Sequence, residues 1–180
     1  MGVKEKMRLD DNGFTMMEVM IVVALIGILA LTAIPTFSVW IPDYRLKGAV
    51  QDIYSNLQLT KMEAIRTKSN QSLTFFSPNA TSYTKTDGTS IDLTSYGSGI
   101  TFGYGDAGTG VYGESKVADS VSYETPDNVA QFNSRGMGNN TGNSGNGFVY
   151  LTNSKGTAYA VGSLTSGVVV LFKWKGSNWE

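Results

Sequence analysis

Cysteine and histidine, two residue types that supply much of enzyme and metal chemistry, are absent from this 180-residue chain. Without cysteine it forms no disulfide and offers no thiolate to a metal. Without histidine it has no Ser-His-Asp triad, no HExxH zinc site and no usual general base near neutral pH. An enzyme built from this sequence would need a carboxylate pair or a Ser-Lys dyad, and no spacing indicates either. We therefore expect no enzymatic activity, no catalytic residue, no metal site and no cofactor.

The chain also lacks an excess of charge of either sign. It has 14 Lys and Arg against 15 Asp and Glu, a formal net charge of −1. No long-range field therefore favours nucleic acid or another highly charged partner. The length fits one globular domain plus an anchor. The 21 glycines, with many Ser, Thr and Asn, are typical of short strands joined by turns.

What the sequence does contain is an uncharged apolar stretch from Val19 to Pro42, directly preceded by Glu18. About 20 apolar residues span a bilayer, so the stretch predicts a transmembrane helix. A charge at the middle of a membrane costs about 2.5–3.5 kcal/mol on insertion scales, so Glu18 needs a partner. We expect that partner to be a new α-amino group on Phe14, made by cleavage after Gly13.

Two plainer interpretations of this amino terminus are a secretory signal peptide and an uncleaved membrane anchor. A secretory signal has an apolar core of about 7–15 residues and is cut at a small-x-small site after that core. Here the Gly13-Phe14 junction precedes the core, and the core is longer. A plain anchor gives no reason for Glu18 near the start of its span. Cleavage after Gly13 is therefore the better interpretation.

The segment Gly13-Phe-Thr-Met-Met-Glu18, followed by the apolar stretch, resembles the class III signal of type IV prepilins and type II secretion pseudopilins. The resemblance implies that a prepilin peptidase removes a leader peptide, residues 1–13, and methylates Phe14. It also implies that Glu18 pairs with the Phe14 amine of a neighbouring subunit during filament assembly. Pro35 falls where pilins have the proline at which the helix loosens inside a filament. The leader is less basic than family leaders, since it combines Lys4, Lys6 and Arg8 with Glu5, Asp10 and Asp11.

One long helix is predicted from Phe14 to about Ser69, with two halves of different character. The first half is apolar all round. The second, residues 43–69, is amphipathic, with an apolar stripe at spacings of three, four and seven formed by Leu46, Val50, Ile53, Leu57 and Ala64. The stripe is too short for a coiled coil, so we expect it to pack on a sheet. Pro42 leaves open whether the two halves are continuous.

From residue 70 to 175 the pattern becomes β. Runs rich in Val, Thr, Tyr and Phe predict eight strands: Ser72–Phe76, Ser82–Thr86, Ile100–Tyr104, Val121–Glu124, Val129–Phe132, Phe148–Thr152, Thr157–Val161 and Val168–Trp174. The last three are expected to be consecutive antiparallel strands, with Val168–Phe172 as a central strand covered on both faces. Tyr96–Gly113 and Gly136–Gly147 are expected to be loops. A long helix followed by strands gives an α+β fold.

Four short segments of the β region resemble the carboxyl-terminal pattern of the GspH/FimT family of minor pseudopilins and pilins: Phe132–Gly136, Gly147–Leu151, Ala158–Val161 and Gly167–Val169. The family fold is a long amino-terminal helix packed on two antiparallel sheets. Many major pilins have a carboxyl-terminal cysteine pair, so its absence here fits a minor subunit better. The resemblance implies assembly through the amino-terminal helix into a type II secretion pseudopilus or a type IV pilus, in support of protein secretion or pilus biogenesis.

The same resemblance implies a location and a set of partners. The chain would be a single-pass protein of the bacterial inner membrane. Residues 1–13 would be the leader, 14–42 the transmembrane and filament-core helix, and 43–180 a periplasmic pilin-like domain. Its partners would be a prepilin peptidase, the major and other minor pseudopilins or pilins, and an inner-membrane assembly platform. The sequence does not separate a secretion system from a pilus.

An alternative function is that of a DNA-binding minor pilin, because some FimT-like pilins take part in DNA uptake. Lys173, Trp174 and Lys175, followed by Trp179, interleave cations with aromatic rings that can stack on bases. In a nearly neutral domain, a solvated strand end is the favoured interpretation, and we expect no nucleic-acid partner. Asp87–Asp92 could offer oxygen ligands to calcium, but its spacing matches no known calcium loop and ordinary turn chemistry explains it.

Overall fold

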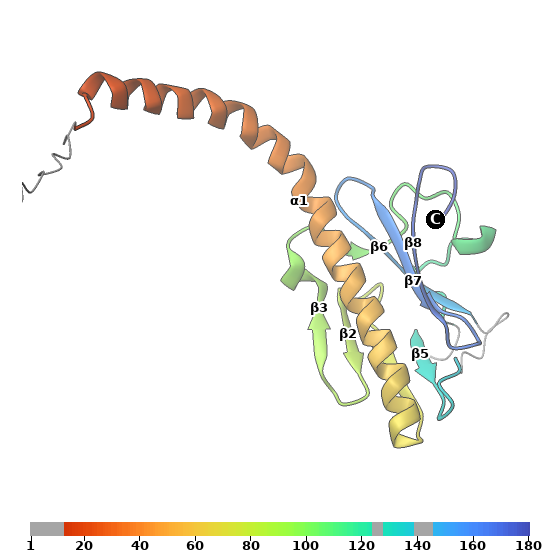
Figure 1. Ribbon diagram of the computed structural model, residues 1–180. Coiled ribbons are helices and arrows are strands. Elements are labelled where there is room, and N and C mark those ends of the chain that lie inside the picture. The colour runs from red at the N-terminus through yellow and green to blue at the C-terminus, as the bar shows by residue number, and fades with distance from the viewer. Residues whose placement is uncertain (1–12, 124–127, 139–145) are drawn as a thin grey trace, which may run out of the picture. The chain divides into compact units, whose positions relative to one another are not determined.

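The computed structural model describes residues 13–123, 128–138 and 146–180, apart from the side chains of residues 32–39. The predicted leader up to residue 12 therefore lies outside the described residues. The chain divides into two compact units, Met1–Val39 and Trp40–Glu180. The second unit contains the later part of the long helix and all the strands among the described residues (Figure 1).

A single helix, α1, spans Met16–Thr67. The expectation of one long helix is confirmed. Pro42 does not end the helix, and Pro35 also lies within its bounds. The residue after α1, Lys68, has a φ of 51°, the left-handed conformation that commonly terminates helices.

Two four-stranded antiparallel sheets follow the helix, as the family resemblance implied. The first has the order β3-β2-β1-β5 and consists of β1 (Gln71–Phe75), β2 (Ser82–Lys85), β3 (Ser90–Asp92) and β5 (Val129–Phe132). The second has the order β4-β6-β7-β8 and consists of β4 (Thr101–Phe102), β6 (Gly147–Thr152), β7 (Ala158–Ser163) and β8 (Val169–Lys173). Two short 3-10 helices, η1 (Leu93–Tyr96) and η2 (Val111–Gly113), lie in the connections. The fold class is α+β, as predicted.

The predicted position of the last strand is wrong. β8 is an edge strand that pairs with β7, whereas β6 and β7 occupy the centre of the second sheet. Val168 is 49% exposed, and most side chains of β8 are only half-buried. The apolar composition of Val168–Phe172 indicated two covered faces, but β7, which contains small residues, is the strand buried along its whole length.

Three other strand predictions differ from the structure. In the predicted strand Val121–Glu124, Val121 forms only an isolated bridge with Val149, Ser122 and Tyr123 are not in a strand, and Glu124 lies outside the described residues. The predicted strand Ile100–Tyr104 contracts to Thr101–Phe102. β3 was not predicted, because three residues with one apolar side chain, Ile91, are too few to give a strand pattern.

The apolar stripe of α1 forms the centre of the main core, as predicted. Its members, Leu46, Val50, Ile53, Leu57 and Ala64, are all 0% exposed. They cluster with inward-facing residues from both sheets, including Leu73, Phe75, Phe132, Val149, Leu151 and Val161. Full burial of one such aliphatic or aromatic side chain is worth about 1.5–3 kcal/mol, so the helix is a structural part of this unit.

A second apolar cluster covers the other face of the second sheet. It contains Tyr104, Ala107, Val111, Phe148, Tyr150, Ala158 and Ala160, with Phe172, Trp174 and Trp179 packed against it. The segment that the sequence indicated only as a loop, Tyr96–Gly113, therefore supplies part of this cover. Burial on both faces explains why β6 and β7 carry apolar side chains without strict alternation.

Candidate assembly and binding sites

The predicted cleavage point lies at the first described residues. Nothing lies within 4 Å of the position that a Cβ atom on Gly13 would take. Phe14 is 84% exposed. Both residues are therefore exposed within the part of the chain that the structure describes.

Glu18 forms a reciprocal cap with Thr15 at the start of α1. The Glu18 N–H donates to Thr15 Oγ1 at 3.2 Å, and the Thr15 N–H donates to Glu18 Oε2 at 3.4 Å. This is a capping box, which satisfies two backbone donors that the first turn leaves unpaired. The Thr-x-x-Glu spacing of this cap is visible in the sequence, although the prediction for Glu18 rests on its charge alone. Glu18 therefore has a structural role within a single chain.

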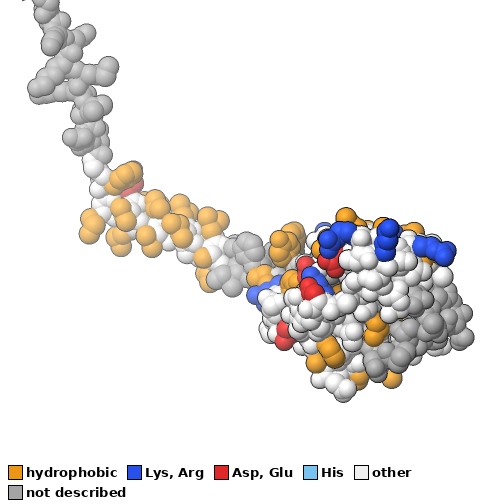
Figure 2. Space-filling view, turned by 90° about the horizontal axis from the view of Figure 1, so that it is seen from below, with side chains coloured by type: hydrophobic (Ala, Val, Ile, Leu, Met, Phe, Trp, Pro, Cys, Tyr) orange, Lys and Arg blue, Asp and Glu red, His pale blue; other side chains and the backbone are white. Residues whose placement is uncertain are grey.

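After this cap, α1 is covered by exposed apolar side chains. The large hydrophobic residues from Val19 to Leu31 are between 48% and 76% exposed. Figure 2 shows hydrophobic side chains along this segment. A helix that is apolar all round needs an apolar environment such as lipid or other helices. Within the part of the chain that the structure describes, no helix meets the length and apolarity required to cross a membrane.

The carboxyl-terminal residues Lys173, Trp174 and Lys175 take part in a short hairpin. The Lys173 N–H donates to the Glu180 carbonyl at 2.6 Å, and the Glu180 N–H donates back at 3.0 Å. The rings of Trp174 and Trp179 lie 5.4 Å apart, at 60° to each other. Trp179 Nε1 also donates to the Thr109 carbonyl at 2.9 Å. The tryptophans are half-buried and pack on each other, which leaves less ring face for a ligand than the sequence indicated.

A cavity of about 310 Å³ lies beside Trp174. Its lining includes Lys155 and Lys173, together with the acidic Asp106. Lys173 Nζ is 5.6 Å from the centre of the Tyr159 ring, a cation–π distance. The structure thus places Lys173 and Trp174 at one site with Lys155, which the sequence analysis did not identify. Lys175 is not among the lining residues, and its N–H donates to Asn178 in the hairpin.

The aspartates of the Asp87–Asp92 segment act in turns. Asp87 accepts a hydrogen bond from the Thr89 N–H at 2.8 Å, and Asp92 accepts one from the Thr94 N–H at 2.8 Å to cap η1. These backbone donors lower the pKa of both carboxyl groups below the usual value. Among the described residues, no group of three or more Asp, Glu, His or Cys is arranged to hold a metal ion.

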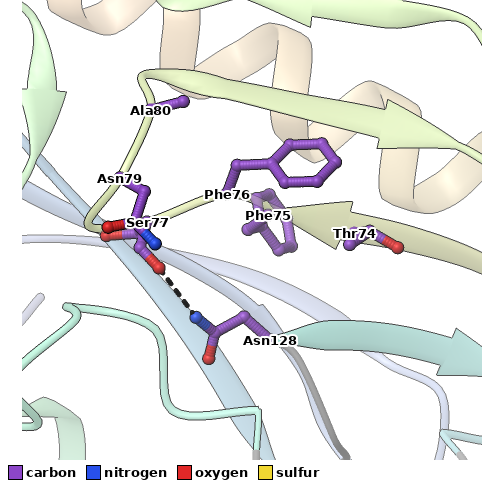
Figure 3. Close-up of a pocket in the computed structure, with 7 residues that line it drawn as sticks. All are labelled: Thr74, Phe75, Phe76, Ser77, Asn79, Ala80 and Asn128. Carbon is purple, nitrogen blue, oxygen red and sulfur yellow. Dashed lines mark hydrogen bonds between the residues drawn. The ribbon is translucent and has the colours of Figure 1, made fainter.

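A further cavity, of about 510 Å³, opens between the ends of β1, β2 and β5. It is lined by Thr74, Phe75, Phe76, Ser77, Asn79, Ala80 and Asn128 (Figure 3). Asn128 Nδ2 donates to the Ser77 carbonyl at 3.1 Å and closes one side of it. None of these lining residues is charged, so none forms an ion pair with a ligand. No signal in the sequence pointed to this cavity.

Residues 8–34 match the prokaryotic N-terminal methylation motif. The match is confined to this amino-terminal segment. The matched residues include Gly13, Phe14 and the capped Glu18.

One solved structure that resembles this chain is the crystal structure of the type IV minor pilin FimU of Pseudomonas aeruginosa. The two chains share 10% identity at a TM-score of 0.45, and the similarity covers 77% of this chain and 94% of that one. A comparison with curated proteins gave no significant match.

Proposed function

We propose that this chain is a minor pilin or pseudopilin subunit of the GspH/FimT type, which enters a helical filament through α1. The observation that carries the proposal is the exposed Gly13-Phe14 pair directly before a capped, apolar helix, inside the matched methylation motif. The apolar stripe packs the later part of α1 against the sheets, which supports a subunit whose globular domain is attached to the filament by that helix.

Three steps follow from these residues. A prepilin peptidase cuts after Gly13 and methylates Phe14. Glu18 then pairs with the Phe14 amine of a neighbouring subunit, an attraction strengthened by the low dielectric of an apolar environment. The apolar stretch from Val19, which spans the inner membrane once before assembly, moves into a bundle of like helices. Pro35 allows α1 to loosen there, while the domain from residue 43 faces the periplasm and then the filament surface.

The partners in this proposal are the prepilin peptidase, the major and other minor subunits, and an inner-membrane assembly platform. The filament is either a type II secretion pseudopilus or a type IV pilus. In both systems the role of the chain is structural, which is in keeping with its lack of histidine and cysteine.

Processing provides the test. Mass spectrometry of the chain purified from membranes of cells with active prepilin peptidase should show the loss of Met1–Gly13 and the gain of one methyl group. Gly13→Leu should retain the leader. Gly27→Leu is the matched control, since nothing lies within 4 Å of a Cβ at Gly27 either. An intact leader on the native chain would overturn the proposal.

A second candidate function is DNA capture, favoured by Lys155 and Lys173, which line one cavity together with Trp174. Basic side chains beside an aromatic ring suit single-stranded nucleic acid. Lys155→Ala and Lys173→Ala should each weaken DNA binding and reduce its salt dependence, whereas Lys68→Ala, at an exposed position after α1, should not. If all three substitutions weaken DNA binding equally, the binding is non-specific electrostatic attraction and this cavity is not a DNA-binding site.

A further inference from the structure

The second unit begins with a pair of exposed aromatic residues on α1. Trp40 is 72% exposed and Tyr44 is 80% exposed. Residues four apart on a helix lie on one face, so the two rings are neighbours. Lys47, also exposed, continues this face one turn later.

This face is separate from the one that α1 buries on the sheets. Leu46 and Val50, the first members of the buried stripe, are 0% exposed and lie elsewhere on the helix. The intervening acidic residue, Asp43, is turned to the domain, since its Oδ1 accepts hydrogen bonds from Asn153 Nδ2 at 2.7 Å and Thr157 Oγ1 at 2.8 Å. The aromatic pair therefore shares its helix face with Lys47, while the Asp43 carboxylate is hydrogen-bonded to the domain.

The position of the pair along the chain indicates what covers it. A hydrocarbon core about 30 Å thick takes about 20 helical residues at 1.5 Å each. Counted from Val19, such a span ends near residue 38, just before Trp40. Trp and Tyr are enriched at this depth of a bilayer, where the ring body is in contact with lipid and the polar atom with water.

We propose that Trp40 and Tyr44 form an interfacial anchor that binds the headgroup layer of the phospholipid bilayer on the domain side of the span. Lys47 extends from the same face towards lipid phosphates, as long cationic side chains do at helix ends. The anchor rests on the proposed function, because it acts while the subunit is stored in the membrane. It fixes the depth of the span and holds the domain at the surface until the subunit is extracted.

Lipid-borne quenchers test the position of Trp40. The full chain is placed in vesicles of phosphatidylcholine and phosphatidylglycerol that carry a nitroxide on the headgroup or bromines deep in the acyl chains. Trp40→Phe, measured in parallel, isolates the emission of Trp40 from that of Trp174 and Trp179. We expect the headgroup label to quench Trp40 several-fold more than the deep label.

Flotation of the vesicles separates the two ways in which this experiment can fail. A chain that does not float with the vesicles contradicts the proposed function. A chain that floats, but whose Trp40 is quenched best by the deep label or by neither label, overturns the anchor alone. The second result is also the one expected if the pair instead packs against another subunit.

A second measurement uses the absence of native cysteine. Gln51→Cys introduces a thiol at an exposed position on the same face, one turn after Lys47. The combined Trp40→Ala and Tyr44→Ala substitutions should change its rate of labelling by a membrane-impermeant maleimide several-fold, because the helix is no longer held at one depth. Leu59→Ala with Met62→Ala, which removes two other exposed apolar side chains further along α1, should leave the rate unchanged. Equal rates in all three backgrounds would overturn the anchor.

Discussion

The hydroxyl of Tyr96 donates a hydrogen bond to Asp52 Oδ2 at 2.6 Å, which joins η1 to α1 across 44 residues of sequence. The same oxygen accepts from the Tyr83 hydroxyl at 2.9 Å and from Asn56 Nδ2 at 3.1 Å. One carboxylate oxygen therefore connects the helix both to the first sheet and to the connection that leaves it. The apolar stripe holds α1 against the sheets, and these hydrogen bonds also fix the position of the sheets along the helix axis.

We predict that Asp52→Ala lowers the free energy of unfolding by about 2–3 kcal/mol, because it leaves the buried Tyr83 hydroxyl with one partner fewer and removes a charged acceptor. Tyr96→Phe should cost less, since it removes one bond and leaves the other two. Chemical denaturation of a fragment beginning near Asp43, which we expect to be soluble and folded, measures both. Equal stability of Asp52→Ala and the native fragment would show that the network contributes nothing net.

The same network predicts a loss of stability at alkaline pH. Burial, together with the Asp52 carboxylate, raises the pKa of Tyr83 and Tyr96 above the usual value. In the unfolded chain tyrosine titrates near pH 10, so the unfolded state releases these protons first. The stabilisation is complete below about pH 10 and is lost as the pH rises further towards the folded-state values. Above pH 8 the melting temperature should fall less steeply with pH for the double variant Tyr83→Phe with Tyr96→Phe than for the native fragment. Parallel curves for the two proteins would show that these tyrosines do not cause the loss of stability.

The burial of the α1 stripe can be tested at two positions on one helix. Ile53 is 0% exposed and Leu59 is 52% exposed. Ile53→Asp should destabilise the fragment by about 4 kcal/mol or more, because it buries an unpaired charge. Leu59→Asp introduces the same group on the outer face and should change stability by about 0.5 kcal/mol or less. Similar melting temperatures for the two variants would show that the stripe does not face the sheets.

Much of the fold could be predicted because its signals are local. The helix and its buried stripe follow from periodicity, and β2 and β5 follow from runs of strand-forming residues between turns. The order of the strands could not be obtained this way, since it depends on what covers each face. Val168–Phe172 is more apolar than Ala158–Ser163, yet the latter is central because Tyr104, Val111 and the terminal tryptophans close over it.

The candidate sites show the same division between local and distant signals. Gly13, Phe14 and Glu18 form one continuous motif and could be identified from the sequence. The cavity beside Trp174 combines Asp106, Lys155 and Lys173, which are far apart in the chain and share no pattern. The capping role of Glu18 differs from this cavity, because its Thr-x-x-Glu signal is local and could have been predicted from the sequence.

That capping role determines how the predicted assembly role of Glu18 must be tested. Glu18→Ala removes both the carboxylate and the side-chain acceptor that caps the Thr15 N–H. Glu18→Gln keeps an acceptor at the position where the capping box accepts either Glu or Gln, but it removes the charge. The two substitutions therefore separate helix capping from charge pairing.

If Glu18 pairs with the Phe14 amine of a neighbouring subunit, both substitutions should leave cleavage and membrane residence intact and impair incorporation into filaments. The reason is that loss of one partner leaves the other charge unpaired in an apolar environment. If Glu18 acts only through the cap, Glu18→Gln should assemble like the native chain and Glu18→Ala should not. Crosslinking to the major subunit, in membranes and in sheared filaments, distinguishes these outcomes. Glu18→Ala removes a charge near the span, so it should not reduce membrane residence. Native levels of crosslinking by this variant would therefore mean that apolar packing alone recruits the subunit.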